Sequence, residues 1–137
     1  MRSYKILVVD DSDRFRQFLV VNLRRRAEFQ SIYEASDGLE AIQRAEELKP
    51  DLILLDIGLP GVNGIEAGRQ IRKASPNSRI LFVSLESSAD VVQEALDLGA
   101  QGYLLKADAG NELLPAADAV LQGKQYLSHS LPGIQRG

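Results

Sequence analysis

Short apolar segments alternate along the chain with longer segments in which apolar residues recur at helical spacing. Residues 5–9, 52–57 and 80–84 form continuous apolar runs that are rich in β-branched side chains. Residues 31–34 and 102–105 are weaker candidates for the same kind of strand. Continuous apolarity is typical of strands that are covered on both faces, as in a parallel sheet.

Five segments that follow these strands carry apolar residues on one face of a helix. The first runs from about residue 12 to 26, the third ends before Pro76, and the fourth ends at Gly99, which suits a helix C-terminus. The fifth ends at Gly123 and contains Pro115, which we expect in its first turn because a helix interior tolerates proline poorly. The apolar positions are Phe15, Phe18, Leu19 and Leu23; Ala41, Ile42, Ala45 and Leu48; Ile65, Gly68 and Ile71; Val91, Val92, Ala95 and Leu98; and Leu113, Leu114, Ala117, Val120 and Leu121.

A strand followed by a helix therefore occurs five times, which predicts an α/β fold. Because crossovers between parallel strands are right-handed, the sheet should be doubly wound, with helices on both faces. Such sheets bind ligands beyond the carboxyl ends of their strands. Residues 128–137 contain Pro132 and little periodicity, so we predict one domain over residues 1–127 and a tail or linker over residues 128–137.

Composition narrows the possible functions. The chain has 137 residues, 45% of them hydrophobic and 26% charged, and a net charge of −3, which fits one globular domain and disfavours a nucleic-acid-holding protein. It has no cysteine, which excludes disulfides and thiolate zinc sites, and a single histidine, His129, which disfavours a Ser–His–Asp triad. The apolar run near the start stops after four residues and no run approaches about 18, so we expect a cytoplasmic protein without a membrane segment.

Polar residues fall at the ends of the predicted strands. Asp10 and Asp11 follow the first strand, Asp56 lies near the end of the third, Ser84 ends the fourth and Lys106 follows the fifth. In a parallel sheet these positions meet at one edge. Each residue alone has an ordinary structural explanation, such as a helix cap or a loop start, so the joint placement carries the prediction.

Three carboxylates about 5 Å apart would repel one another by roughly 3 kcal/mol per pair at an effective dielectric constant near 20. A divalent cation relieves this repulsion, and Mg²⁺ prefers hard oxygen ligands. One carboxylate could then act as a nucleophile, with the lysine and the hydroxyl holding phosphoryl oxygens.

These residues resemble a known family. Ile-Leu-Val-Val-Asp-Asp at residues 6–11, Asp-Leu-Ile-Leu-Leu-Asp-Ile-Gly-Leu-Pro-Gly at 51–61, Ser84, and Tyr-Leu-Leu-Lys at 103–106 are similar to the receiver domain of two-component response regulators. Residues 99–106 look most like the LuxR-type (NarL/FixJ) subfamily. The resemblance covers roughly residues 5–122 and implies a flavodoxin-like fold with five strands in the order 2-1-3-4-5 and five helices.

The resemblance also implies a role for each matching residue. Asp56 would accept a phosphoryl group from a sensor histidine kinase. Asp11 and Asp56 would ligate Mg²⁺ directly, together with the backbone carbonyl of Gly58, and Asp10 would act mainly through a bound water.

The remaining matches concern the phosphoryl group and the response to it. Ser84 would hydrogen-bond a phosphoryl oxygen, Lys106 would pair with the phosphoryl group, and Tyr103 would turn inward as Ser84 moves. Ser84 stands where the family usually has threonine, and Ala107 stands where it has proline. A cis bond before a residue other than proline costs about 2.5–4 kcal/mol, so we expect a trans bond before Ala107.

The function so implied is a phosphorylation-dependent signalling receiver, and no enzyme beyond catalysis of its own Asp phosphorylation and dephosphorylation. It would switch a surface for a partner or a homodimer and control transcription through a DNA-binding output domain that this chain lacks. Two alternatives stay open. One is a haloacid-dehalogenase-like phosphatase, for which Asp11-x-Asp13 formally supplies the two acids. The other is an interaction module that is never phosphorylated.

Overall fold

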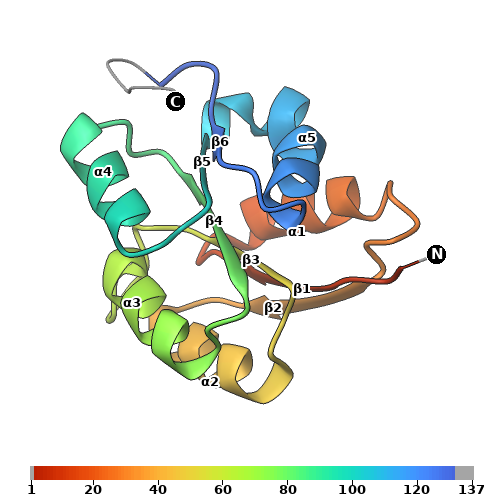
Figure 1. The fold of residues 1–137 in the computed structure, drawn as a ribbon, viewed down its shortest axis with the longest axis horizontal. Helices are drawn as coiled ribbons and strands as arrows, with labels where there is room; N and C mark the ends of the chain where they lie inside the picture. The colour runs from red at the N-terminus through yellow and green to blue at the C-terminus, as the bar shows by residue number, and fades with distance from the viewer. Residues whose placement is uncertain (1, 132–137) are drawn as a thin grey trace.

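One parallel sheet with helices on both faces makes up the fold of this computed structural model, which describes residues 2–131 (Figure 1). The strands are β1 (Lys5–Val9), β2 (Ser31–Ala35), β3 (Leu52–Leu55), β4 (Arg79–Ser84), β5 (Gly102–Leu105) and β6 (Tyr126–Leu127). The helices are α1 (Asp13–Leu23), α2 (Gly38–Leu48), α3 (Gly64–Ala74), α4 (Ala89–Asp97) and α5 (Ala109–Leu121), and a 3₁₀ turn, η1 (Lys106–Asp108), precedes α5. The strand order is β2-β1-β3-β4-β5-β6.

The apolar run of β3 shows why apolar and polar residues do not alternate along the central strands. Leu52 and Leu54 point to the core on the side of α1 and α5, whereas Ile53 and Leu55 point to the core on the side of α2, α3 and α4. All four side chains are fully buried. Both faces of the strand are therefore covered by helices, as the sequence predicts (Figure 1).

The predicted order 2-1-3-4-5 is confirmed, and the structure adds a short sixth strand at the β5 edge. β6 has only two residues, too few to show a strand pattern in the sequence.

The third strand ends at Leu55, and the first helix ends at Leu23, three residues before its predicted end. Residues 24–28 form turns and a bend instead. Among residues 2–131, no helix is long and apolar enough to cross a membrane.

Pro115 lies in the middle of α5, so the expectation that it occupies the first turn is wrong. The turn η1 precedes the helix and α5 itself begins at Ala109, which moves the proline to the seventh position. Pro115 is exposed, so water can reach the carbonyl of Asn111 that the missing N–H leaves unbonded. The opposite face of the helix holds it in place through the buried side chains of Leu113, Ala116, Ala117 and Val120.

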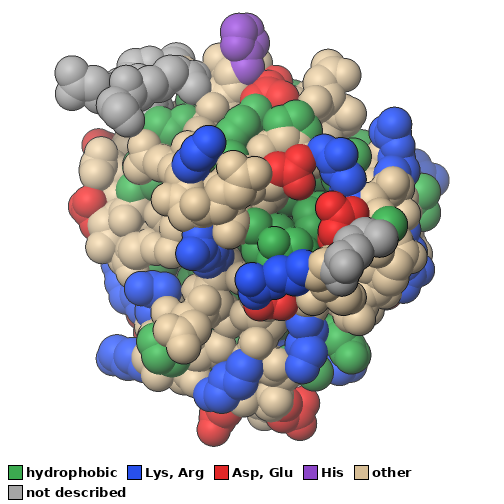
Figure 2. All heavy atoms as spheres, turned by 45° about the vertical axis from the view of Figure 1, so that its right-hand side comes forward, with side chains coloured by type: hydrophobic (Ala, Val, Ile, Leu, Met, Phe, Trp, Pro, Cys, Tyr) green, Lys and Arg blue, Asp and Glu red, His purple; other side chains and the backbone are tan. Residues whose placement is uncertain are grey.

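Basic side chains cluster at the edge of the sheet where the strands begin. The N-terminal end of β1 comes forward in Figure 2, and Lys and Arg side chains outnumber Asp and Glu on the face shown. Lys5 Nζ donates to the carbonyl of Leu48 at 3.0 Å, and Arg79 Nη1 donates to the carbonyl of Val120 at 2.7 Å. Both carbonyls end helices, so these cations stabilise the negative ends of the helix dipoles.

The chain after α5 returns to the sheet as a segment that we call the C-terminal strap, residues 126–131. β6, at its start, pairs in parallel with β5 (Figure 1). Ser128 and Leu131 are buried, and Leu131 joins the core on the side of α2, α3 and α4. His129 is exposed. The first four residues of the predicted tail thus lie against the domain, and residues 132–137 are outside the described residues.

Candidate functional site

Three carboxylates meet at the carboxyl edge of the sheet. Val9 and Leu55, the last residues of β1 and β3, are partners in register, so Asp10 and Asp56 lie side by side. Carboxylate oxygens of Asp10, Asp11 and Asp56 all lie within 4.8 Å of one another. Asp10 is 1% exposed and Asp56 is 6% exposed, while Asp11 is open to solvent. Such a group of hard oxygen ligands can hold a divalent cation.

Lys106 supplies the positive charge of the site. Its Nζ lies 2.8 Å from Asp10 Oδ2 and 3.1 Å from Asp56 Oδ2. Burial raises the pKa of Asp10, and the hydrogen bonds from Lys106 and from the Ser12 backbone N–H only partly oppose this effect. Burial lowers the pKa of Lys106, but its hydrogen bonds to the two carboxylates outweigh burial, so the net pKa is raised. The lysine is therefore charged at neutral pH.

Two residues of α1 support these charges, and sequence reasoning gave neither of them a role at the site. The Phe15 ring centroid lies 4.5 Å from Lys106 Nζ, a cation–π contact. Arg16 Nη1 donates to the backbone carbonyl of Asp10 at 2.7 Å. Helical periodicity assigned Phe15 only to a packed face, and no sequence signal links Arg16 to the first strand.

The loop between β3 and α3 passes close over Asp56. A Cβ atom at Gly64 would lie 2.0 Å from the Asp56 carbonyl oxygen and 2.5 Å from Ile57 Cα, so only glycine fits there. The Gly64 N–H donates to the carbonyl of Ile57 at 2.8 Å. Gly58 has no atom within 4 Å of the Cβ position and lines the same cavity as Asp56. The loop thus leaves the Gly58 backbone beside the acids.

Ser84 lines the same cavity as Asp11 and Asp56, and Tyr103 lies next to Ser84. Ser84 Oγ is buried and accepts the N–H of Glu86 at 3.2 Å. Tyr103 is fully buried, and its hydroxyl donates to the carbonyl of Glu86 at 2.7 Å. Burial raises the pKa of Tyr103 to about 12; a hydrogen bond with Ser84 opposes this rise, and the charges of Glu86 and Asp56 add to it. Tyr103 therefore faces inward as a neutral phenol.

The structure brings the predicted residues to one place. A cavity of about 420 Å³ opens at the carboxyl edge, lined by Asp11, Ser12, Asp56, Ile57, Gly58, Ser84, Leu85, Glu86 and Lys106. Asp10 lies beneath it through its contact with Lys106, and Tyr103 lies behind Ser84. Asp13, the second acid of the phosphatase-like pattern, does not belong to the acid cluster. Its side chain is 88% exposed and pairs with Arg16 at 2.6 Å.

Comparison with known proteins agrees with this geometry. The family model described as the response regulator receiver domain matches residues 6–118. The chain belongs to this family. Receivers of two-component systems are signalling domains that take their signal from histidine kinases. The cavity that holds the acids, the hydroxyl and the lysine is accordingly the candidate functional site of this receiver domain.

Curated relatives of this receiver are named as regulatory proteins. "Transcriptional regulatory protein DegU" of Brevibacillus brevis is 35% identical over 123 residues, which cover 90% of this chain and 52% of that protein. "Nitrate/nitrite response regulator protein NarL" of Escherichia coli (strain K12) is 37% identical over 129 residues, which cover 94% of this chain and 60% of that protein. The chain therefore spans 52% and 60% of the length of these two curated relatives.

A solved structure supports the LuxR-type subfamily. The crystal structure of a LuxR-family two-component response regulator from Aurantimonas sp. SI85-9A1 has a TM-score of 0.89 and 32% sequence identity, and the match covers 94% of this chain and 92% of that one. The receiver is accordingly LuxR-type. No peptide bond within residues 2–131 is cis, so the bond before Ala107 is trans, as expected.

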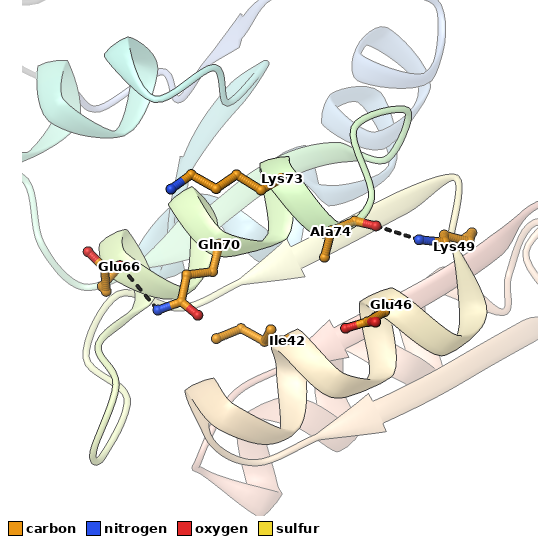
Figure 3. A pocket seen from close by; sticks show the side chains of 7 residues that line it. All are labelled: Ile42, Glu46, Lys49, Glu66, Gln70, Lys73 and Ala74. Carbon is orange, nitrogen blue, oxygen red and sulfur yellow. Dashed lines mark hydrogen bonds between the residues drawn. The ribbon is translucent and has the colours of Figure 1, made fainter.

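A larger groove lies between α2 and α3 and shares no residue with the acidic cavity. Its volume is about 530 Å³, and it is lined by Ile42, Glu46, Lys49, Glu66, Gln70, Lys73 and Ala74 (Figure 3). The Lys49 ammonium donates to the carbonyl of Ala74, and the Gln70 amide donates to Glu66 at 3.2 Å. The Lys49 contact joins the end of α2 to the end of α3, the Gln70 contact lies within α3, and we assign no chemistry to this groove.

Proposed function

We propose that this receiver accepts a phosphoryl group on Asp56, with Mg²⁺ as cofactor and a sensor histidine kinase as donor. The observation that carries the proposal is the meeting of Asp10, Asp11 and Asp56 with Lys106 in one cavity. Asp56 is the only one of the three acids that both lines the cavity and bonds to Lys106. It is thus both reachable by a donor and held by a cation.

The transfer itself is a displacement at phosphorus. A carboxylate oxygen of Asp56 forms a bond to the phosphorus atom, and the bond between phosphorus and the donor's nitrogen or oxygen breaks. The leaving group departs with the electron pair of that bond. Lys106 keeps its proton and stabilises the negative charge of the phosphoryl oxygens, since its ammonium already lies 3.1 Å from Asp56.

The residues present fit a magnesium ion. Asp11 and Asp56 would hold it directly with the Gly58 carbonyl, and Asp10 would act through a bound water. This donor set consists of hard oxygens, and Mg²⁺ keeps several waters when it binds through one or two carboxylates. When bound, the ion neutralises the clustered carboxylates and supplies positive charge for the phosphoryl oxygens.

We assign Ser84 and Tyr103 to the response. Ser84 lies at the rim of the cavity and its hydroxyl can reach an added phosphoryl oxygen once it leaves the Glu86 N–H. Tyr103 is tied to the same segment through the Glu86 carbonyl. A shift of Ser84 and Glu86 would therefore move Tyr103 and the surface formed by α4, β5 and α5, a change produced by a local charge.

The downstream output is also a proposal. The curated relatives are named as transcriptional regulators and are longer than this chain. We infer that the phosphorylated surface serves a partner or a homodimer, and that contact with DNA takes place through an output domain beyond this chain.

Intact-mass measurement after incubation with Mg²⁺ and acetyl phosphate tests the proposal. The wild type should gain one phosphoryl group, and Asp56→Ala should gain none. Glu47→Gln, which changes an exposed acid on α2, is the matched control and should behave as the wild type does. An unmodified wild type, or an equal adduct on Asp56→Ala, would disprove phosphorylation at Asp56.

The same samples separate the alternatives. Steady turnover of a phosphomonoester would identify a phosphatase, whereas a receiver yields at most one adduct per chain. An interaction module would leave partner binding and self-association unchanged when Mg²⁺ and beryllofluoride are added. A receiver should change its association state or its conformation under these conditions.

A further inference from the structure

The C-terminal strap is built into the domain beside the lysine of the site. Its Ser128 is fully buried, although serine is a polar residue, and it uses both its backbone and its side chain. The Ser128 N–H donates to the carbonyl of Tyr103 at 2.9 Å, which continues the pairing of β6 with β5. Figure 1 shows the strap running along β5 on the outer edge of the sheet.

The Ser128 hydroxyl connects the two sides of Lys106. It accepts the N–H of Leu105, the residue before the lysine, at 3.1 Å. It also donates to the carboxylate of Asp108, two residues after the lysine. One buried hydroxyl thus spans the turn η1 that carries Lys106.

A second residue of the strap strengthens this connection. Ser130 donates to the Asp108 carboxylate through its N–H at 3.0 Å and through its hydroxyl at 2.9 Å. The hydrogen bond from Ser128, together with those from Ser130, lowers the pKa of Asp108. The carboxylate is therefore ionised and firmly held at neutral pH.

The centre of the turn does not pack into the core. Ala107, at its centre, is exposed and offers only a methyl group for packing. The Lys106 side chain must nevertheless hold its ammonium within 3.1 Å of both Asp10 and Asp56. Small displacements of a charged group at a phosphoryl-transfer site reduce the rate strongly.

We propose that Ser128, through Leu105 and Asp108, is a positioning residue that places the Lys106 ammonium on Asp10 and Asp56. Where it concerns the rate of phosphoryl transfer, this inference rests on the proposed function. Where it concerns the place of the lysine, it rests on the hydrogen bonds of the strap alone. Ser128 thereby belongs to the support of the site, although it lies after the last helix.

Two measurements on full-length variants test this. The first is the rate at which a trace amine-acylating reagent labels Lys106 at fixed pH without Mg²⁺, read by peptide mass spectrometry. Ser128→Ala should raise this rate several-fold, because the released turn lets the ammonium leave its carboxylates. Asp108→Ala should do the same, and combining the two should add little, because both break one connection.

The second measurement is the rate of phosphorylation of Asp56 by acetyl phosphate. Ser128→Ala should lower the rate at saturating donor by about tenfold, while the Mg²⁺ concentration for half-maximal rate stays near that of the wild type. Ser128→Thr, which keeps the hydroxyl, should restore the rate. Tyr126→Phe removes the 2.7 Å hydrogen bond between strap and Glu112 and leaves the turn intact, so it should match the wild type in both measurements.

The outcomes are distinct. If Ser128→Ala labels Lys106 no faster than Tyr126→Phe does, the inference is wrong, whatever the phosphorylation rate. If labelling responds as expected but the wild type gains no phosphoryl group, the proposed function fails and the placement of Lys106 by Ser128 stands. A loss of rate that Ser128→Ala and Tyr126→Phe share would show a general effect of the strap on stability and would overturn the specific role of Ser128.

Discussion

The Lys106 ammonium lies 2.8 Å from a carboxylate oxygen of Asp10, whose residue is only 1% exposed. A carboxylate buried to this degree costs free energy unless a charge or hydrogen bonds compensate it. Among the residues that the structure describes, two groups compensate the Asp10 carboxylate. They are the Lys106 ammonium and the Ser12 N–H, which lies 2.8 Å from Asp10 Oδ1. The lysine is consequently part of the fold as well as of the site.

Replacing Lys106 by methionine should destabilise the protein without Mg²⁺. The variant keeps the apolar stem but leaves Asp10 and Asp56 without their cation. Removing one partner of a buried pair costs up to about 5 kcal/mol, and we expect about 1–3 kcal/mol here, since Asp10 can take up a proton and keeps the Ser12 bond. Urea unfolding at neutral pH measures the loss.

Adding Mg²⁺ tests whether the loss of stability in Lys106→Met is electrostatic. Addition of Mg²⁺ should return much of the lost stability to Lys106→Met, because the ion replaces the missing positive charge. A loss that is the same with and without Mg²⁺ would instead point to packing of the lysine stem against Phe15.

Replacing Asp11 by asparagine should have the opposite effect on the metal-free protein. It relieves repulsion within the cluster of Asp10, Asp11 and Asp56, and because Asp11 is exposed we expect a gain of only about 0.5–1 kcal/mol. The same change should abolish most of the stabilisation by Mg²⁺. Thermal unfolding with and without Mg²⁺ measures both effects, and Glu47→Gln should show neither.

Gly58, in the loop before α3, and Gly64, the first residue of α3, provide a matched pair. Gly64→Ala would place a methyl group 2.0 Å from the Asp56 carbonyl oxygen, so it should cost about 3 kcal/mol or more and disturb the site. Gly58→Ala meets no atom within 4 Å and should change stability by less than about 0.5 kcal/mol. Denaturant unfolding of both variants checks the contrast, and equal losses would contradict the close approach at Gly64.

Tyr103 should ionise later than an ordinary tyrosine. Its phenol has a pKa of about 12 in the fold against an ordinary 10.0, so the neutral form is favoured by folding. The resulting stability is complete below pH 10 and is lost as the pH rises through about 12. Ultraviolet titration of the phenols should show a late step that Tyr103→Phe removes.

A late step that persists in Tyr103→Phe would belong to another of the four tyrosines. In that case the burial of Tyr103 behind Ser84 would not describe the protein in solution. Stability between pH 10 and pH 12 should also fall less in Tyr103→Phe than in the wild type, because the phenylalanine ring does not ionise.

Much of the site could be predicted from the polar residues at the ends of the predicted strands. The apolar run before Asp56 identified a buried strand, and a parallel sheet then required Asp10, Asp56 and Lys106 to share an edge. Phe15 and Arg16 could not be found in this way. Their contacts depend on the angle at which α1 packs beside the acids, and periodicity carries no information on that angle.

The predicted tail, residues 128–137, also contains contacts that the sequence could not predict. Ser128 lies in a segment with proline, glycine and little periodicity, a composition that is typical of a linker. Two residues of β6 are too few to give a strand pattern, and the Ser128 hydroxyl finds its partners only because β5 and η1 are already in place. A long-range hydrogen bond leaves no local trace in the chain.

Local chemistry therefore determined the five strand–helix units, the edge at which the acids meet, and the trans bond before Ala107, because each depends on neighbours in the chain or on the rule for parallel strands. Tertiary packing alone decided the extension of α5 through Pro115, the glycine-only approach at Gly64, and the docking of Ser128 beside Lys106. These depend on surfaces that exist only after distant segments have come together.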